Sequence, residues 1–173
     1  RSELPNILRG CNSSGLMVTH DPEEAMSICD KVAVMKEGKI HQIDTPINLL
    51  NNPKTIFVSS FILGNNIINI KKNVDSFMSC LGELKTPVLL NNTYVNKMSI
   101  SPKFISIKKS EKGEANVISK EFLGEYLIYK VSINENILRV RTNINNLLNN
   151  GDKCSLSIKN NSYYYLYPGA YKV

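Results

Sequence analysis

The part of the sequence from residue 66 onward consists of short runs rich in β-branched and aromatic residues. Turn-forming segments such as "EKGE", "NEN" and "NNGDK" separate them. The eight runs are "IINIKK", "TYVNKMSI", "FISIKK", "ANVISKEFL", "EYLIYKVSI", "NILRVRT", "KCSLSI" and "SYYYLY". A succession of short strands is typical of a small barrel or sandwich. We therefore predict an all-β domain over residues 66–173.

Residues 1–65 have a different, mixed α/β pattern. "SELPNILRG" is a short helix candidate, and the apolar run "GLMVT" at residues 15–19 predicts a buried strand of a parallel sheet. The next helix has three start signals: Asp21 as its cap, Pro22 at the first helical position, and Glu24 completing a capping box. The sequence therefore alternates between strand and helix patterns here.

Residues 31–64 continue this alternation. "VAVM" and "KIHQI", joined by "KEG", predict a β-hairpin. A short helix should follow, with Thr45 at its cap and Pro46 at its first position. "TIFVSSFILG" predicts a further helical segment that Gly64 ends. The domain boundary is expected near residues 64–66.

The composition is that of an ordinary globular protein, with 42% hydrophobic and 21% charged residues. The net charge of +6 comes mostly from scattered lysines, which favours a solvated basic surface over a dedicated polyanion site. The four cysteines form no C-x-x-C pair, which argues against a zinc site. Because the chain lacks an apolar run of about 18 residues and a signal peptide, we expect a cytosolic protein with reduced thiols.

His20 is the candidate catalytic residue. It directly follows the predicted strand and directly precedes the predicted helix. Ligands of open α/β sheets gather at the carboxyl ends of strands, and a histidine there can donate a hydrogen bond to a phosphate oxygen. The alternative is a capped strand-to-helix turn in which the histidine has no role.

The segment "VTHDPEEAMSICDKVAVMKEGKIHQIDTPINLLNNPKTIFVSSFILGNN" resembles the end of the ATP-binding subunit of ABC-type importers. The likeness runs without a gap from about Val18 to Phe61, and "FILG" departs from the family's hinge by one extra residue. The resemblance implies that His20 is the switch histidine, which contacts the γ-phosphate and orders the attacking water. It also implies ATP and magnesium as cofactors of the parent protein.

Beyond the hinge, "ISPKFISIKK", "EFLGEYLIYKVSI" and "YLYPG" resemble the TOBE domain, a small OB-like β-barrel. Ser101 stands where many relatives have arginine, so a ligand role of that arginine does not carry over. The fold class implied is a short remnant of an ABC ATPase α/β domain over residues 1–65, followed by an OB-like barrel over residues 66–173.

The resemblance further implies partners and a location. The partners are a second copy of the chain, in a homodimer that could exchange segments, and membrane permease subunits. The location is the inner face of the cell membrane, where the subunit is cytoplasmic and peripheral. Among the substrates of the group, which include sulfate, phosphonates and sugars, we favour iron(III) or polyamines.

The sequence lacks the motifs that bind and hydrolyse nucleotides. Its only Gly-Lys pair, Gly38–Lys39, precedes Ile40 in a hairpin and is not a phosphate-binding loop. "SSGLM" resembles the family's signature sequence only superficially, and no apolar strand ends in Asp-Glu. We therefore predict that the chain alone is inactive and binds neither cofactor nor metal.

Two alternatives come from other functional classes. One is a free-standing TOBE-type protein that binds an oxyanion such as molybdate or serves regulation. The other is an OB-like surface for nucleic acid, which would need exposed aromatic residues from "SYYYLY" at residues 162–167. Because the last strand usually contributes to the core, we expect these tyrosines to be buried and no nucleic-acid partner.

Overall fold

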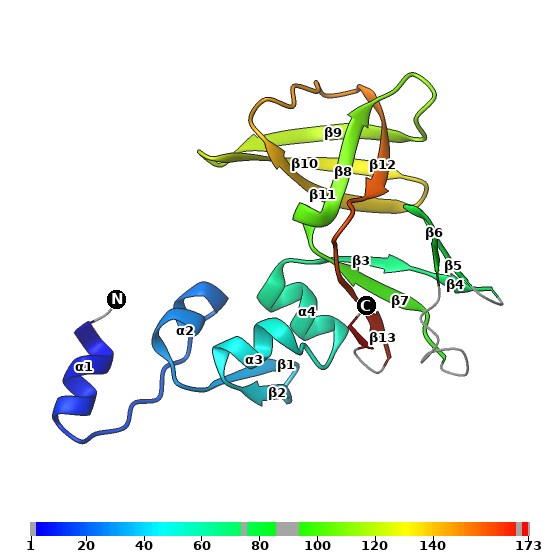
Figure 1. Ribbon diagram of the computed structural model, residues 1–173. Coiled ribbons are helices and arrows are strands. Elements are labelled where there is room, and N and C mark those ends of the chain that lie inside the picture. The colour runs from blue at the N-terminus through cyan, green and yellow to red at the C-terminus, as the bar shows by residue number, and fades with distance from the viewer. Residues whose placement is uncertain (1–2, 74–75, 86–93, 169–170, 173) are drawn as a thin grey trace. The chain divides into compact units, whose positions relative to one another are not determined.

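The computed structural model describes residues 3–73, 76–85, 94–168 and 171–172 (Figure 1). The chain divides into two compact units, Arg1–Leu63 and Gly64–Val173. The elements of the first unit are α1 (Glu3–Gly10), α2 (Pro22–Ile28), β1 (Val32–Lys36), β2 (Lys39–Asp44), α3 (Pro46–Asn51) and α4 (Ile56–Leu63). None of the described helices is long and apolar enough to cross a membrane.

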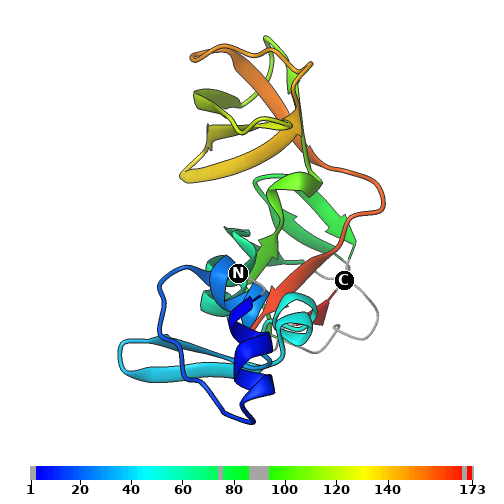
Figure 2. The ribbon, with the colours of Figure 1, turned by 90° about the vertical axis from the view of Figure 1, so that its left-hand side faces the viewer.

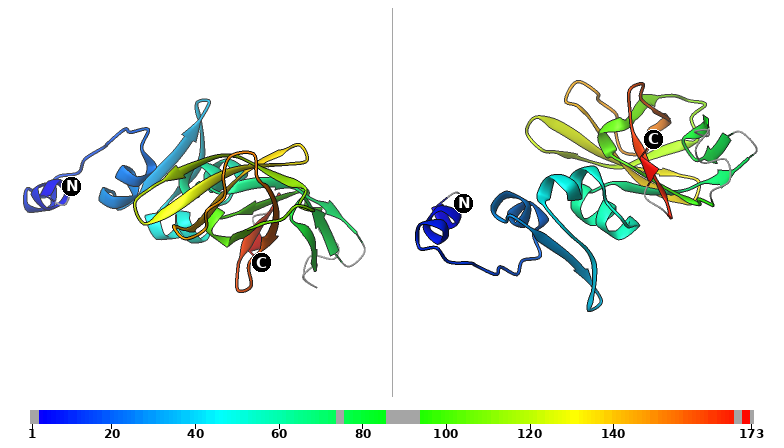
Figure 3. Two further views of the ribbon diagram at one scale, coloured as in Figure 1. Left: turned by 90° about the horizontal axis from the view of Figure 1, so that it is seen from above. Right: turned by 60° about the horizontal axis from the view of Figure 1, so that its bottom comes forward.

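The predicted hairpin is confirmed. β1 pairs antiparallel with β2, with Lys36 opposite Lys39. The two residues between the strands, Glu37 and Gly38, have φ values of 51° and 74°. Two consecutive left-handed residues are typical of a two-residue turn that matches the twist of a hairpin. Figure 3 shows the hairpin extending beyond helices α3 and α4.

The predicted helices α3 and α4 are confirmed as well. The Thr45 hydroxyl accepts a hydrogen bond from the Asn48 N–H at 3.3 Å and so caps α3. Helix α4 ends at Leu63, directly before Gly64, whose φ is 61°. Four buried side chains form the small core of this unit: Val32, Val34, Leu49 and Val58. Partly buried apolar residues of α2 and α4 pack against this core.

The strand predicted at residues 15–19 is wrong. The segment is irregular and joins α1 to α2 as an open stretch (Figure 2). Leu16 and Val18 are 96% and 91% exposed. A strand needs a hydrogen-bonded neighbour, and the two strands described in this unit, β1 and β2, pair with each other. The remnant of a parallel sheet therefore stays a prediction without support from the strand pairing.

The second unit is built almost entirely of strands. They are β3 (Asn66–Asn69), β4 (Lys71–Lys72), β5 (Ser76–Ser79), β6 (Gly82–Lys85), β7 (Lys97–Ile100), β8 (Ile105–Lys109), β9 (Ala115–Phe122), β10 (Tyr126–Ile133), β11 (Asn136–Asn143), β12 (Lys153–Ile158), β13 (Tyr164–Tyr167) and β14 (Tyr171–Lys172). Each of the eight predicted runs contains a strand. Strands β5, β6 and β14 were missed: "SFMS" and "GELK" carry a weak β pattern, and β14 is only two residues long.

The predicted mostly β fold is confirmed, but the described strands form open sheets and no closed barrel, so the predicted OB-like barrel is not confirmed. One sheet has the order β11-β10-β9-β12-β8, a second β14-β13-β7-β3, and a third β4-β5-β6. Strands β8 and β11 are the edges of the five-stranded sheet, and they approach each other without pairing (Figure 1). The physical reason is that β11 ends at Asn143, and the Asn-rich segment after it is irregular. Asn tolerates left-handed and turn conformations, which interrupt a strand.

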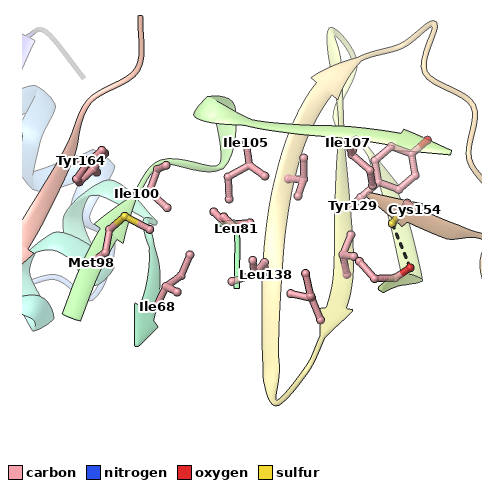
Figure 4. Close-up of a cluster of buried hydrophobic side chains, with 14 of the residues drawn as sticks. Ile68, Leu81, Met98, Ile100, Ile105, Ile107, Tyr129, Leu138, Cys154 and Tyr164 are labelled. Atoms are coloured by element: carbon pink, nitrogen blue, oxygen red, sulfur yellow. Dashed lines mark hydrogen bonds between the residues drawn. The ribbon is translucent and has the colours of Figure 1, made fainter. Parts of the chain in front are cut away.

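A single core fills the space between the five- and four-stranded sheets. Side chains of both sheets meet in it, as Figure 4 shows for Ile68, Met98 and Ile100 on one side and Leu138 and Tyr129 on the other. The prediction for the final strand is confirmed within β13, where Tyr164, Tyr165 and Tyr167 are buried, but Tyr163, directly before the strand, is 37% exposed. Tyr164 belongs to the core, and the three buried rings are not available as stacking platforms for nucleic acid.

Candidate functional site

His20 lies at the surface of the first unit, at the last position before the cap of α2. Its side chain is exposed, and the backbone forms a bend there. The predicted position before a helix is therefore confirmed. The predicted position after a buried strand is not, because residues 15–19 are irregular and the apolar side chains of Leu16 and Val18 are exposed.

The polar residues around His20 hold the start of α2. The Asp21 carboxylate accepts hydrogen bonds from the N–H groups of Glu23 and Glu24, at 2.9 and 3.3 Å. The predicted cap is thus present. One bond of the predicted capping box is wrong, because the Glu24 carboxylate does not accept directly from the Asp21 N–H. Instead, the Asp21 N–H donates to the Thr19 hydroxyl at 3.1 Å, and that hydroxyl donates to the Glu24 carboxylate at 2.7 Å. Thr19 therefore bridges the two groups that the capping box would join directly.

Because Thr19 and Asp21 are engaged with the start of α2, the exposed His20 imidazole is the side chain at this turn that can donate a hydrogen bond to an anion. The first N–H groups of α2 are bonded to Asp21, and the side chains beside them are carboxylates. Such a neighbourhood repels an anion, so the described residues around His20 do not fit a nucleotide by themselves. Among the described residues, no cluster of three or more His, Cys, Asp or Glu side chains could hold a metal ion.

Gln42 is a buried polar residue that the sequence interpretation missed. Its amide nitrogen donates to the Asn52 carbonyl at 3.1 Å, and its amide oxygen accepts from the Lys54 N–H at 2.9 Å. These two bonds connect β2 to the loop between α3 and α4. Next to it, the His41 ring lies 5.0 Å from the Phe57 ring and 3.4 Å from the Thr55 hydroxyl. The sequence did contain a sign of this role, because Gln42 is a polar residue between His41 and Ile43 in a strand with alternating apolar residues.

The four cysteines are free thiols. Cys154 is buried in the core of the second unit, and its sulfur lies 3.5 Å from the Ala115 carbonyl oxygen (Figure 4). Burial raises the pKa of the Cys154 and Cys80 thiols, because it disfavours the thiolate. These two thiols are therefore structural rather than nucleophilic.

Comparison with known proteins gives a partial likeness. No family model matches the chain. Over 77 residues, 44% of its length, the chain is 46% identical to the spermidine/putrescine import ATP-binding proteins of Bacillus thuringiensis (strain Al Hakam) and Bacillus anthracis. It is 46% identical over 67 residues, 39% of its length, to the protein of the same description from Trichormus variabilis. The matched stretch covers 23% of the Bacillus proteins and 18% of the Trichormus protein, so this chain spans well under two thirds of their length.

Proposed function

We propose that this chain is the C-terminal section of the ATP-binding subunit of an ABC-type importer that takes up polyamines. The observation that carries the proposal is the 46% identity to importer ATP-binding proteins described as acting on spermidine and putrescine. These relatives favour polyamines over iron(III), the other substrate class expected from the sequence. Comparing spermidine and iron(III) uptake by cells with and without the protein tests this choice.

In this proposal the first unit is the end of the nucleotide-binding domain, and the second unit is a TOBE domain. Two features support the assignment of the first unit. Its elements follow the order of the family segment, with α2, the hairpin, α3 and α4 after His20. The caps at Asp21 and Thr45 begin helices where the family pattern expects them. ATP and magnesium would be bound mostly by parts of the longer subunit other than this chain.

The role proposed for His20 is that of the switch histidine in the complete subunit. The test is the ATPase rate of the complete subunit in its transporter, with His20→Ala compared against His41→Ala. Loss of a preorganised hydrogen-bond donor to the reacting phosphate costs about 10²- to 10³-fold in rate. His41→Ala is the matched control, because that ring packs on Phe57 within the first unit. Equal, small losses in both variants would contradict the role of His20.

The chain by itself should bind magnesium–ATP weakly. Positioning by a phosphate-binding loop and magnesium supplies most of phosphoryl-transfer catalysis, and the residues around His20 offer one donor. A calorimetric titration of residues 1–173 with magnesium–ATP is expected to show no micromolar site. A tight site would contradict the assignment of the chain as the end of the nucleotide-binding domain.

The proposed assembly contains two copies of the subunit and the membrane permease subunits, on the cytoplasmic face of the membrane. Dimerisation through the second unit is testable by light scattering over a range of protein concentrations. A dimer is expected as the concentration rises. A monomer at all concentrations would contradict self-association of this unit.

A further inference from the structure

The second unit contains an open polar groove along the unpaired edge of β8. Residues Ile105–Lys109 of β8 line it together with Thr142, Asn143, Asn145 and Asn146, which lie at and beyond the end of β11, and with Lys159. The groove thus occupies the gap between the two edges of the five-stranded sheet. Its volume is about 570 Å³. Small-molecule sites are typically about 300–1,000 Å³, so the groove has room for a metabolite.

The charge of the groove is of one sign. Three lysines, three asparagines, one serine and one threonine contribute to the lining, and no carboxylate does. The unit around it carries the whole positive excess of the chain: residues 64–173 contain 15 Lys and Arg but eight Asp and Glu, whereas residues 1–63 contain six and seven. Such a surface attracts anions and raises their local concentration.

Some of the lining groups are engaged and others are available to a ligand. The Lys109 ammonium lies 2.9 Å from Asp152, and the Lys159 ammonium donates to the Lys103 carbonyl at 2.7 Å. The Asn146 amide donates to the Ile107 carbonyl at 3.3 Å and so fixes one wall against the other. The side chains of Lys108 and Asn145 make no hydrogen bond or ion pair with the other described residues.

We propose that this groove binds a phosphorylated small molecule. Lysine ammonium groups bind phosphate as point charges, and Lys108 has its charge free for that purpose. The asparagine amides can both donate to and accept from the hydroxyl or ring groups of the ligand body. The proposal goes beyond the importer function and does not depend on it.

Lysines on an edge strand also have a simpler role, because their charge discourages pairing with another strand. That role requires no ligand. It therefore predicts no saturable binding in the groove, and a titration separates the two explanations.

The test is an NMR titration of residues 1–173 at constant ionic strength with AMP and with glucose 6-phosphate. Adenosine, glucose and inorganic phosphate serve as comparison compounds. We expect saturable shifts of the backbone amides of Lys108 and Asn145 with at least one phosphorylated compound. Lys108→Gln should weaken that binding about three- to fivefold, as loss of one exposed charge interaction does.

Two matched variants sharpen the result. Lys112→Gln removes a charge outside the groove and should leave the affinity unchanged. Asn145→Leu should weaken the binding of the phosphorylated compound but not the binding of inorganic phosphate. The proposal is overturned by the absence of saturation at millimolar ligand, by equal weakening in Lys112→Gln, or by equal affinity for the unphosphorylated compound. It is also overturned if inorganic phosphate binds as tightly, because the amides would then contribute nothing.

Discussion

The Asn66 side chain exchanges two hydrogen bonds with the backbone of Arg139. Its Nδ2 donates to the Arg139 carbonyl at 2.8 Å, and its Oδ1 accepts from the Arg139 N–H at 2.8 Å. Asn66 belongs to β3 of the four-stranded sheet, and Arg139 to the edge strand β11 of the five-stranded sheet. A buried side chain therefore joins the two sheets as a short piece of backbone pairing would.

Replacing Asn66 by aspartate should destabilise the protein. A carboxylate still accepts from the Arg139 N–H, but it cannot donate to the Arg139 carbonyl and places its charge against that oxygen. The free energy of unfolding should fall by about 1–3 kcal/mol, the cost of an unsatisfied buried polar group. Urea unfolding of Asn66→Asp and of Asn116→Asp, the same change at an exposed strand position, measures this. Equal losses in the two variants would show that the connection between the sheets contributes little.

Tyr129→Phe should lower the free energy of unfolding by a similar amount. The buried Tyr129 hydroxyl accepts from the Leu148 N–H at 3.0 Å and donates to the Asn146 carbonyl. Phenylalanine keeps the ring but leaves both backbone groups without this partner, for about 1–3 kcal/mol. Tyr126→Phe is the control: the Arg141 guanidinium lies 3.7 Å from the Tyr126 ring centre, and phenylalanine preserves that contact. Thermal unfolding measures both variants. A lower melting temperature for Tyr126→Phe than for Tyr129→Phe would contradict the stabilising role of the Tyr129 hydroxyl.

Asp21→Ala should loosen the first turn of α2. The carboxylate holds the N–H groups of Glu23 and Glu24, and loss of such a cap costs about 1 kcal/mol. Amide hydrogen exchange at these two residues should become faster, while exchange in β10 stays unchanged. Ser27→Ala removes an exposed bond to the Glu24 carbonyl and should have a smaller effect. Unaltered exchange in Asp21→Ala would mean that α2 is held by its packing alone.

The contribution of Asp152 to the stability of the fold should depend on pH. A hydrogen bond from the Asn149 N–H and the Lys109 ammonium lower the pKa of the Asp152 carboxyl below its ordinary value of 3.8. A lowered folded-state pKa stabilises the fold above 3.8, and this stabilisation is lost as the pH falls below it. Asp152→Asn should therefore lower the melting temperature at pH 7 but have little effect near pH 2. Lys109→Gln keeps the hydrogen bond from Asn149 to Asp152, so it should lower the melting temperature at pH 7 by less. If Asp152→Asn lowered the melting temperature equally at pH 7 and pH 2, the stabilisation by the ionised Asp152 would be contradicted.

Several elements follow from the sequence because their causes are local. Glu37 and Gly38 set the hairpin turn, Asp21 and Thr45 cap their helices, and the final strand is apolar enough to be buried. The run of β-rich segments likewise predicted most strands of the second unit. For the turn and the two caps, the deciding interactions lie within a few residues of each other.

Other features depend on partners distant in the sequence. The run at residues 15–19 has the composition of a buried strand but finds no hydrogen-bonded neighbour among the described strands. The bonds of Gln42 reach 10 and 12 residues away, and Asn66 meets its partner 73 residues away. The groove along β8 exists because β11 ends before it can pair with that strand. The sequence by itself thus determined the turns, caps and strand patterns, whereas the tertiary structure decided which edges pair and which polar groups meet, because long-range contacts fix both.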